Sequence, residues 1–217
     1  MHGARMWPSA WSRQAGTIDD TRWVVLDVES SGLDTARDRL LAIAAVSVRH
    51  DGRRAWIDLA DSFEALVQQP TRDVPPDKAN ILVHGIGIGA QRRGGDASAV
   101  LAGFEAFVGS SPLLGFHAAF DRRMIERASH AALGRRLRNP WLDIADLAAV
   151  LLPQLGARTL DDWLEALHID CAQRHQAAAD TLATAELLLR LWPAAQAEGA
   201  KDFRGFERLA SRRRWLS

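Results

Sequence analysis

The sequence predicts a single α/β domain in which a mixed β-sheet is flanked by helices. The chain has 217 residues, a length that suits one domain with a sizeable core. Three strand-like apolar runs come first, an amphipathic helix and another short strand follow, and helical patterns dominate the remainder. Strands in direct succession favour antiparallel pairing, whereas strands separated by a helix favour parallel pairing. Because no internal repeat or low-complexity linker interrupts this order, we expect no second domain.

The composition is that of an ordinary globular protein, with 47% hydrophobic and 25% charged residues. The 27 basic and 27 acidic residues cancel, so no overall positive field attracts nucleic acid. A site that neutralises phosphate locally does not need such a field. The single cysteine, Cys171, cannot form an internal disulfide, and no cysteine and histidine spacing typical of zinc sites occurs. Because no segment resembles a signal peptide or a membrane helix, we expect a cytoplasmic location.

Three strands are expected at the start of the domain. The first lies in the stretch 23–33, which is apolar, carries two acids and ends in a sharp turn. Residues 40–48 form a second, nearly continuous apolar run. The Asp-Gly pair at 51–52 predicts a tight hairpin turn into a third strand at 56–59.

Helices are expected in most of the remaining sequence. Apolar residues recur at helical spacing from 97 to 108, and residues 112–116 then predict a buried strand. Thr159 fits the N-cap of a capping box. The other long helices are expected at residues 118–133, 144–152, 160–167 and 177–191.

The expected domain limits follow from these patterns. Residues 1–22 are expected to be an N-terminal extension, residues 23–193 the domain, and residues 194–217 a C-terminal tail. Within the domain, prolines mark a loop before a short helix at 78–83, which is expected to end at His84 and Gly85.

Two carboxylates mark the end of the first strand. Asp27 and Glu29 alternate with Leu26 and Val28, so in an extended strand the two acids point to one face. Neighbouring carboxylates repel each other, and without a cation one of them is driven to take up a proton. The pair is therefore half of a candidate metal site, although a strand that ends in surface acids has the same spacing.

Two later segments add further candidate ligands. Asp121 follows the short strand at 112–116, near the start of the next helix. His175 and Asp180 lie on either side of the start of the helix at 177–191. Five residues advance about 500° around a helix, so these two side chains cannot share one helical face. We therefore expect His175 to project from the loop or first turn and Asp180 from the helix.

Together the three segments resemble the three motifs of the DnaQ-like 3′→5′ exonucleases. This family is the histidine-bearing branch of the Asp-Glu-Asp-Asp superfamily and includes the proofreading epsilon subunit of bacterial DNA polymerase III. The resemblance runs from about Trp23 to about Leu191 and includes the Val-His-Gly-Ile loop at 83–86 and the segment 142–144. It implies a ribonuclease H-like fold. The sister branch uses a tyrosine in place of the histidine, and this sequence contains no tyrosine.

The resemblance also implies a complete site. Its residues would be Asp27, Glu29, Asp121 and Asp180 as ligands of two divalent ions, with His175 as the general base. Asp27 would bridge the ions, Glu29 and Asp180 would favour the ion that carries the water, and Asp121 would hold the other. Oxygen ligands suit Mg²⁺ or Mn²⁺. Two such ions stabilise both the attacking and the leaving oxygen of a phosphodiester.

Several residues depart from the family pattern without touching a ligand. Ser30 and Ser31 stand where threonines are common, and Ala42 stands where a glutamate is common. Phe116 and His117 replace a His-Asn pair, which affects the pocket expected for the terminal nucleotide. For His117, packing and substrate contact both remain open.

The function that the resemblance implies is metal-dependent 3′→5′ exonuclease activity on single-stranded or frayed 3′ ends. DNA is the first expectation, and nucleoside 5′-monophosphates would be released. One alternative is an exoribonuclease resembling ribonuclease T or oligoribonuclease, and another is a non-catalytic nucleic-acid-binding module. The intact ligand set argues against the second alternative. A polymerase subunit is a possible partner, but attachment to one is not implied. Asp143 is expected to be structural, and Arg212 to Arg214 are expected to form a solvated face.

Overall fold

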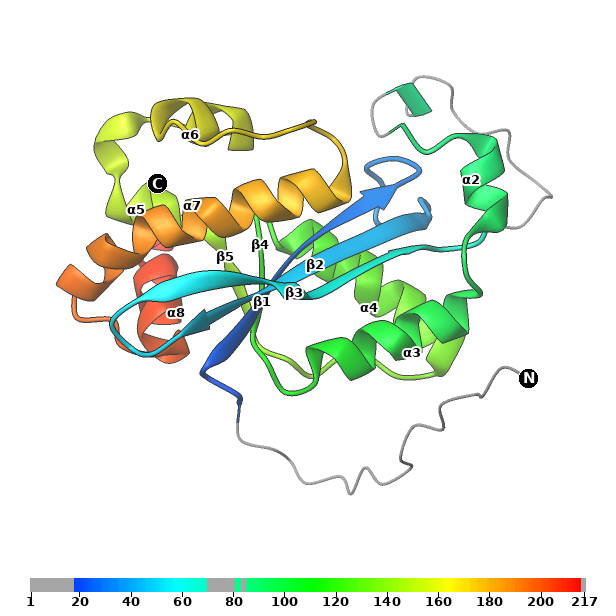
Figure 1. The fold of residues 1–217 in the computed structure, drawn as a ribbon, viewed down its shortest axis with the longest axis horizontal. Coiled ribbons are helices and arrows are strands. Elements are labelled where there is room, and N and C mark those ends of the chain that lie inside the picture. The colour runs from blue at the N-terminus through cyan, green and yellow to red at the C-terminus, as the bar shows by residue number, and fades with distance from the viewer. Residues whose placement is uncertain (1–17, 70–80, 83–84, 216–217) are drawn as a thin grey trace.

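A five-stranded mixed β-sheet forms the centre of the computed structural model, which describes residues 18–69, 81–82 and 85–215 (Figure 1). The strands lie in the spatial order β3-β2-β1-β4-β5. β1 pairs antiparallel with β2 and β2 with β3, whereas β4 is parallel to β1 and β5 is parallel to β4. The strand bounds are β1 Arg22–Ser30, β2 Leu40–His50, β3 Ala55–Leu66, β4 Leu113–Gly115 and β5 Trp141–Asp143. The predicted mixed sheet is confirmed.

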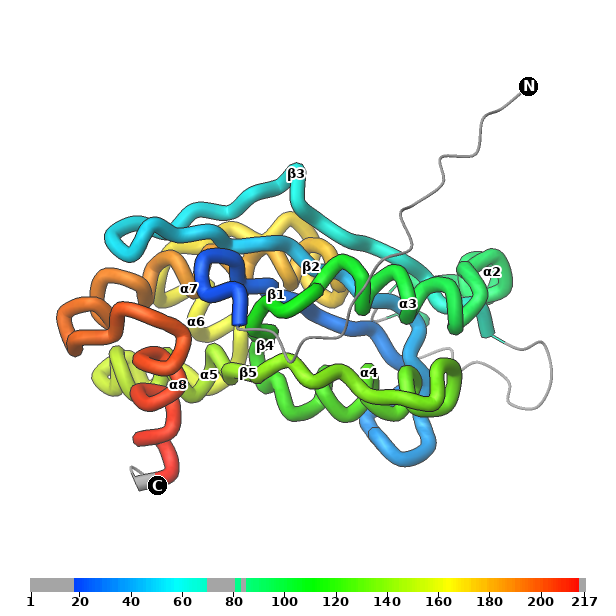
Figure 2. Tube along the Cα trace, turned by 90° about the horizontal axis from the view of Figure 1, so that it is seen from below, coloured from blue at the N-terminus to red at the C-terminus, as the bar shows by residue number. Residues whose placement is uncertain are grey.

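Helices pack on both sides of this sheet. Figures 1 and 2 show α3 beside α4 in one group, and α5 beside α8 with α7 across the sheet in the other. The helix bounds are α2 Ile88–Arg93, α3 Ala97–Val108, α4 Ala119–Leu133, α5 Ile144–Leu151, α6 Leu160–Ala166, α7 Ala177–Ala197 and α8 Phe203–Ser211. Short 3₁₀ turns follow α5 at Pro153–Leu155 and α8 at Arg212–Trp215. The five long helices expected from periodicity are therefore present, and Thr159 caps α6 through a capping box, as predicted.

The two faces of β1 contribute to two different apolar cores. Trp23 and Val25 belong to the core beneath α5, α7 and α8, whereas Leu26 and Val28 belong to the core beneath α3 and α4. Alternation along an extended strand produces this division, because successive side chains point to opposite faces. Asp27, which follows Val25 by two residues, therefore lies on the face of the sheet that α7 covers.

The third strand is longer than the sequence predicts. It runs from Ala55 to Leu66 and pairs with β2 at residues 55–58 and 62–66; residues 59–61 form a bulge opposite the step from Val46 to Ser47. The acids and small residues after Leu59 hide the strand pattern, but Phe63 and Ala65 pack against the α3 and α4 core. The bulge shifts the register, so a single alternation does not describe the whole strand.

Residues 194–211, which the sequence assigns to a C-terminal tail, are largely helical. Residues up to Ala197 continue α7 past Pro193, and α8 then begins after Asp202, whose side chain caps it. Phe206 of α8 is fully buried and lies 4.9 Å from Trp23 between ring centroids. This packing holds α8 against the start of β1, so the helix is part of the core of the fold.

Smaller differences concern short elements. α2 and β5 are not predicted from the sequence, since six and three residues are too few to show a period. Most of the short helix predicted at 78–83 lies outside the described residues, although Ile81 and Leu82 are helical. No helix within the described ranges is long and apolar enough to cross a membrane.

Candidate metal centre and catalytic site

The two acids of β1 point toward α7 from the middle of the sheet. Asp27 lies opposite Ala44 of β2, and Glu29 lies opposite Ala42. Directly opposed residues share a face of the sheet, so these small neighbours leave space above the carboxylates. A glutamate at position 42, as is common in the resembled family, would add another carboxylate beside Glu29. The predicted common face of Asp27 and Glu29 is confirmed.

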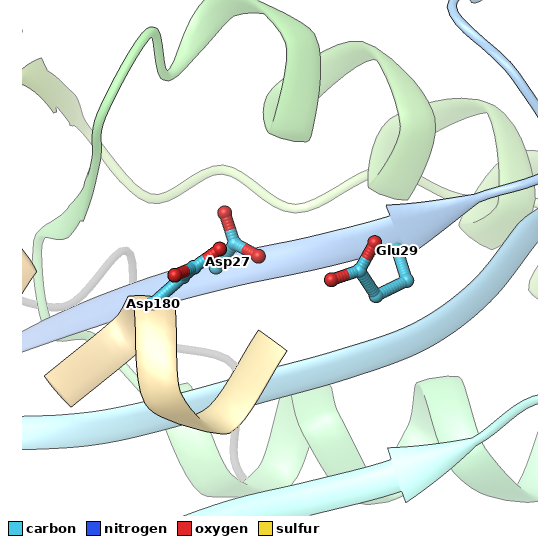
Figure 3. Close-up of side chains that lie close together, drawn as sticks. All are labelled: Asp27, Glu29 and Asp180. Carbon is cyan, nitrogen blue, oxygen red and sulfur yellow. The ribbon is translucent and has the colours of Figure 1, made fainter. Parts of the chain in front are cut away.

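The first turn of α7 supplies a third carboxylate. Asp180 is buried, and its ligand oxygen lies with those of Asp27 and Glu29 in a group whose members are all within 4.8 Å of one another (Figure 3). His175 precedes the helix in a loop, with a backbone φ of 61°, and its backbone N–H donates to Asp180 Oδ2 at 2.9 Å. The expected placement of His175 in the loop and Asp180 on the helix is therefore confirmed. The His175 side chain is exposed.

Asp121 approaches the same region from the other side of β1. It lies in the first turn of α4, is buried, and accepts a hydrogen bond at Oδ1 from the backbone N–H of Val28 at 3.1 Å. A Cβ atom at Gly115 would lie 3.1 Å from Asp121 Oδ2, a tight contact, so glycine at this position gives the Asp121 carboxylate room beside β4. Asp121 is thus fixed next to the strand that carries Asp27 and Glu29, but it stands outside the three-carboxylate group.

Burial and mutual repulsion raise the pKa values of these carboxyls. Burial raises the pKa of Glu29 to about 8, and the charges of Asp180 and Asp121 add to the effect. The pKa of Asp27 is also raised, mainly by burial and then by Asp121. Burial raises the pKa of Asp121 to about 7, although the Val28 N–H opposes the shift. So many acids need a cation to ionise together at neutral pH, and their oxygen donors fit Mg²⁺ or Mn²⁺.

Without divalent ions, the protein is expected to lose stability as the pH rises from about 5 to about 8. The pKa of Glu29 is about 8 in the folded protein against an ordinary 4.5, so the folded state holds more protons than the unfolded state between these values. This contribution is complete below the unfolded pKa and is lost as the pH passes the folded pKa. Thermal unfolding in chelator at unit pH steps measures it.

Two comparisons make this pH prediction specific. Added Mg²⁺ should recover most of the lost stability at pH 8, because it neutralises the ionised carboxylates. Glu29→Gln should show a shallower decline than the unaltered protein, since the amide does not titrate. A melting temperature that stays level or rises across this pH range in chelator would contradict the raised pKa of Glu29.

The sequence alone does not identify three residues that lie near Asp180, namely Arg174, Asp161 and Cys171. Arg174 forms ion pairs through Nη1 with Asp180 Oδ1 and through Nε with Asp161 of α6. Cys171 Sγ lies 3.6 Å from the same Asp180 oxygen. The cluster forms where the loop 167–176 passes α6, and no periodic pattern reports such a loop. A useful signal was the position of Arg174, a cation directly before the motif histidine.

The segment around His117 has a structural partner. His117 adopts a φ of 58°, and its backbone N–H donates to Asp143 Oδ1 at 3.1 Å. Asp143 also caps α5 by accepting from the Ala145 N–H at 2.9 Å, which agrees with its expected structural role. The imidazole packs edge-on against Phe116, with ring centroids 4.6 Å apart. The His117 side chain is exposed, so packing and substrate contact both stay predictions.

The turn after β1 contains Ser30 and Ser31, which stand where the resembled family commonly has threonines. Ser30 Oγ donates to the Gly32 carbonyl at 2.6 Å, and Ser31 Oγ donates to Asp38 Oδ1 at 2.9 Å. Both interactions use the hydroxyl that serine shares with threonine. The turn therefore keeps its hydrogen bonds without the two methyl groups.

Comparison with known proteins places this fold and this sequence in one family. The family model described as Exonuclease matches residues 24–188. A DNA polymerase III subunit epsilon-like protein of Rhodobacter capsulatus is 34% identical over 189 residues, which cover 86% of this chain and 26% of that protein. The PolC-type DNA polymerase III of Bacillus subtilis is 28% identical over 193 residues, 88% of this chain and 13% of that one.

A solved structure gives the same picture of the fold. The zinc-bound form of the complex between E. coli exonuclease I and single-stranded DNA has a TM-score of 0.66 at 19% identity, covering 82% of this chain and 43% of that one. At this identity the likeness concerns the fold. Since the family model spans most of the chain, from β1 to α7, the chain belongs to the Exonuclease family.

Proposed function

We propose that this protein is a metal-dependent 3′→5′ exonuclease that acts on single-stranded or frayed 3′ ends, with DNA as its first substrate. The observation that carries the proposal is the group formed by Asp27, Glu29 and Asp180, three carboxylates from two elements within 4.8 Å of one another. A group of this kind is costly to bury without a cation. Membership in the Exonuclease family supports phosphodiester hydrolysis as its use.

The chain's own residues divide the proposed work. Asp27, Glu29 and Asp180 would hold one divalent ion, and Asp121 with Asp27 a second. Mg²⁺ or Mn²⁺ bound there would supply Lewis-acid stabilisation of the charge that develops on the phosphate oxygens. His175, exposed at the edge of the site, would accept the proton of the attacking water as the general base.

The substrate is proposed from chemistry and from relatives. The chain has no net charge, so binding of a phosphate backbone would depend on ions and local groups. Two relatives are named as DNA polymerase III proteins, and the cited exonuclease I structure contains single-stranded DNA. The chain spans about a quarter or less of those two relatives' lengths, so we propose no polymerase partner.

The expected result in solution is a ladder of products shortened from the 3′ end. With Mn²⁺, a 5′-labelled single-stranded DNA oligonucleotide should give progressively shorter labelled products, and excess chelator should stop the reaction. Blunt duplex DNA should react more slowly, because the terminal nucleotide must leave its stack to reach the carboxylates. Gel analysis of timed samples measures both rates.

A matched RNA oligonucleotide and the fate of the 5′ label decide between the alternatives. Faster cleavage of an RNA oligonucleotide of the same sequence would favour the exoribonuclease, and binding without cleavage would favour the non-catalytic module. Immediate release of the 5′ label as a mononucleotide would contradict the proposed polarity. Full activity in chelator would contradict the metal dependence.

A further inference from the structure

Arg174 lies between a buried acid and an exposed one. Its guanidinium pairs through Nη1 with Asp180, whose side chain is 7% exposed, and through Nε with Asp161, whose side chain is 62% exposed. The Arg174 side chain itself is 26% exposed. A guanidinium presents donors on several sides, so one residue can hold both carboxylates at once. Arg174 is therefore positioned at the boundary between the carboxylate group and solvent.

The oxygens of Asp180 are largely committed to the loop that precedes α7. Oδ1 receives Arg174 Nη1 and has Cys171 Sγ at 3.6 Å, while Oδ2 accepts the backbone N–H of His175 at 2.9 Å. A carboxylate oxygen offers about two lone-pair directions. Both directions of Oδ1 are thus in use and one remains on Oδ2. A divalent ion that binds Asp180 would encounter Oδ1 with its lone pairs already engaged. It would also be repelled by the positive charge of Arg174.

We propose that Arg174 is a built-in counter-ion of Asp180 that competes with the divalent ion, so that ion binding moves the guanidinium off Asp180 while Asp161 keeps its Nε. The inference rests on the metal dependence proposed above and adds a residue that sets the ion affinity of the site. Asp161 is suited to this role because it belongs to α6, outside the carboxylate group. The competition makes ion loading weaker than the three carboxylates alone would allow.

Calorimetric titration with Mn²⁺, in the absence of nucleic acid, tests the competition. Arg174→Gln should bind Mn²⁺ more tightly, by roughly three- to tenfold, the range expected for loss of a partly buried ion pair and its charge. Arg174→Lys keeps the charge and should stay within about twofold of the unaltered protein. Arg212→Gln is the matched control, because Arg212 follows α8 and pairs at 3.0 Å with Glu198, which caps the C-terminal end of α7, whereas Asp180 lies in the first turn of that helix. It should leave Mn²⁺ affinity unchanged.

The outcomes separate this inference from the proposed function. If the unaltered protein binds no Mn²⁺, the proposed function fails and the inference fails with it. If it binds Mn²⁺ but Arg174→Gln binds equally or more weakly, Arg174 does not compete and only the inference is overturned. Tighter binding in Arg174→Lys as well would also overturn it, because the positive charge would then have no effect.

A second measurement uses the unaltered protein and does not depend on how well Arg174→Gln folds. In protein labelled with ¹⁵N-arginine, the Nε–H resonance that disappears in Arg174→Lys identifies Arg174. Titration with diamagnetic Mg²⁺ should shift this resonance as the guanidinium leaves Asp180, and the Arg212 resonance should not move. A fixed Arg174 resonance at saturating Mg²⁺ would overturn the proposal.

Discussion

Replacement of Asp27 with asparagine is expected to abolish ion binding and nucleolytic turnover together. Asp27 lies in the three-carboxylate group and is electrostatically linked to Asp121 as well. The amide keeps the shape of the side chain but removes the charge that both proposed ion positions share. Calorimetric titration with Mn²⁺ and single-turnover cleavage of labelled single-stranded DNA, run on the same preparation, measure the two losses.

The matched control is Asp58→Asn on β3. Asp58 is an acid of the same sheet, but it pairs with Arg49 at 3.1 Å rather than with the site. A partly exposed pair of this kind contributes little, so folding, ion binding and turnover should all persist. If Asp27→Asn kept measurable Mn²⁺ binding with normal turnover, Asp27 would not be the shared ligand.

Replacement of His175 with alanine is expected to slow turnover by about 10² to 10⁴ while leaving ion binding intact. The contact between His175 and Asp180 is made by the backbone N–H, which alanine retains. The substitution therefore removes the proposed proton acceptor and keeps the carboxylates in place. Single-turnover cleavage of labelled single-stranded DNA measures the loss of rate, and calorimetric titration with Mn²⁺ should be unchanged.

His168→Ala is the control, because His168 also adopts a positive backbone φ. His168 has a φ of 52°, close to the 61° of His175, and its side chain is also exposed. Alanine at a positive φ costs backbone energy in both variants, so that cost cancels in the comparison. Normal turnover in His175→Ala would show that His175 is not the general base. Loss of ions as complete as in Asp27→Asn would instead show that it supports the ligands.

The sequence predicts the parts of the site that depend on local geometry. The common face of Asp27 and Glu29 follows from strand alternation, and the separation of His175 from Asp180 follows from the helical turn. The strands β1 and β2 and the long helices are also predicted, because each buries a regular apolar pattern in one of the two cores. The nearness of Asp121 to β1 came instead from the resemblance of three ordered motifs.

Other features depend on contacts that no local pattern records. The ion pairs of Arg174 join a loop to α6 and α7, and the loop has no period to read. α8 looks like a charged tail because charged residues alternate with its buried apolar ones: Arg204 lies between Phe203 and Phe206, and Glu207 and Arg208 precede Leu209. Its nine residues make little more than two turns, which is too short for a clear helical period. Its apolar face is recognised as part of the core only because Trp23 packs against it.

The docking of α8 on the start of β1 also has a consequence for the order in which the protein can fold. The Phe203 N–H donates to Asp20 across 183 residues, and Phe206 packs on Trp23. During synthesis the first strand would therefore emerge long before the helix that covers it. Contacts of such separation close late and slow the search for the native state. The strand that carries Asp27 and Glu29 should accordingly gain its full protection from hydrogen exchange only after α8 has been made.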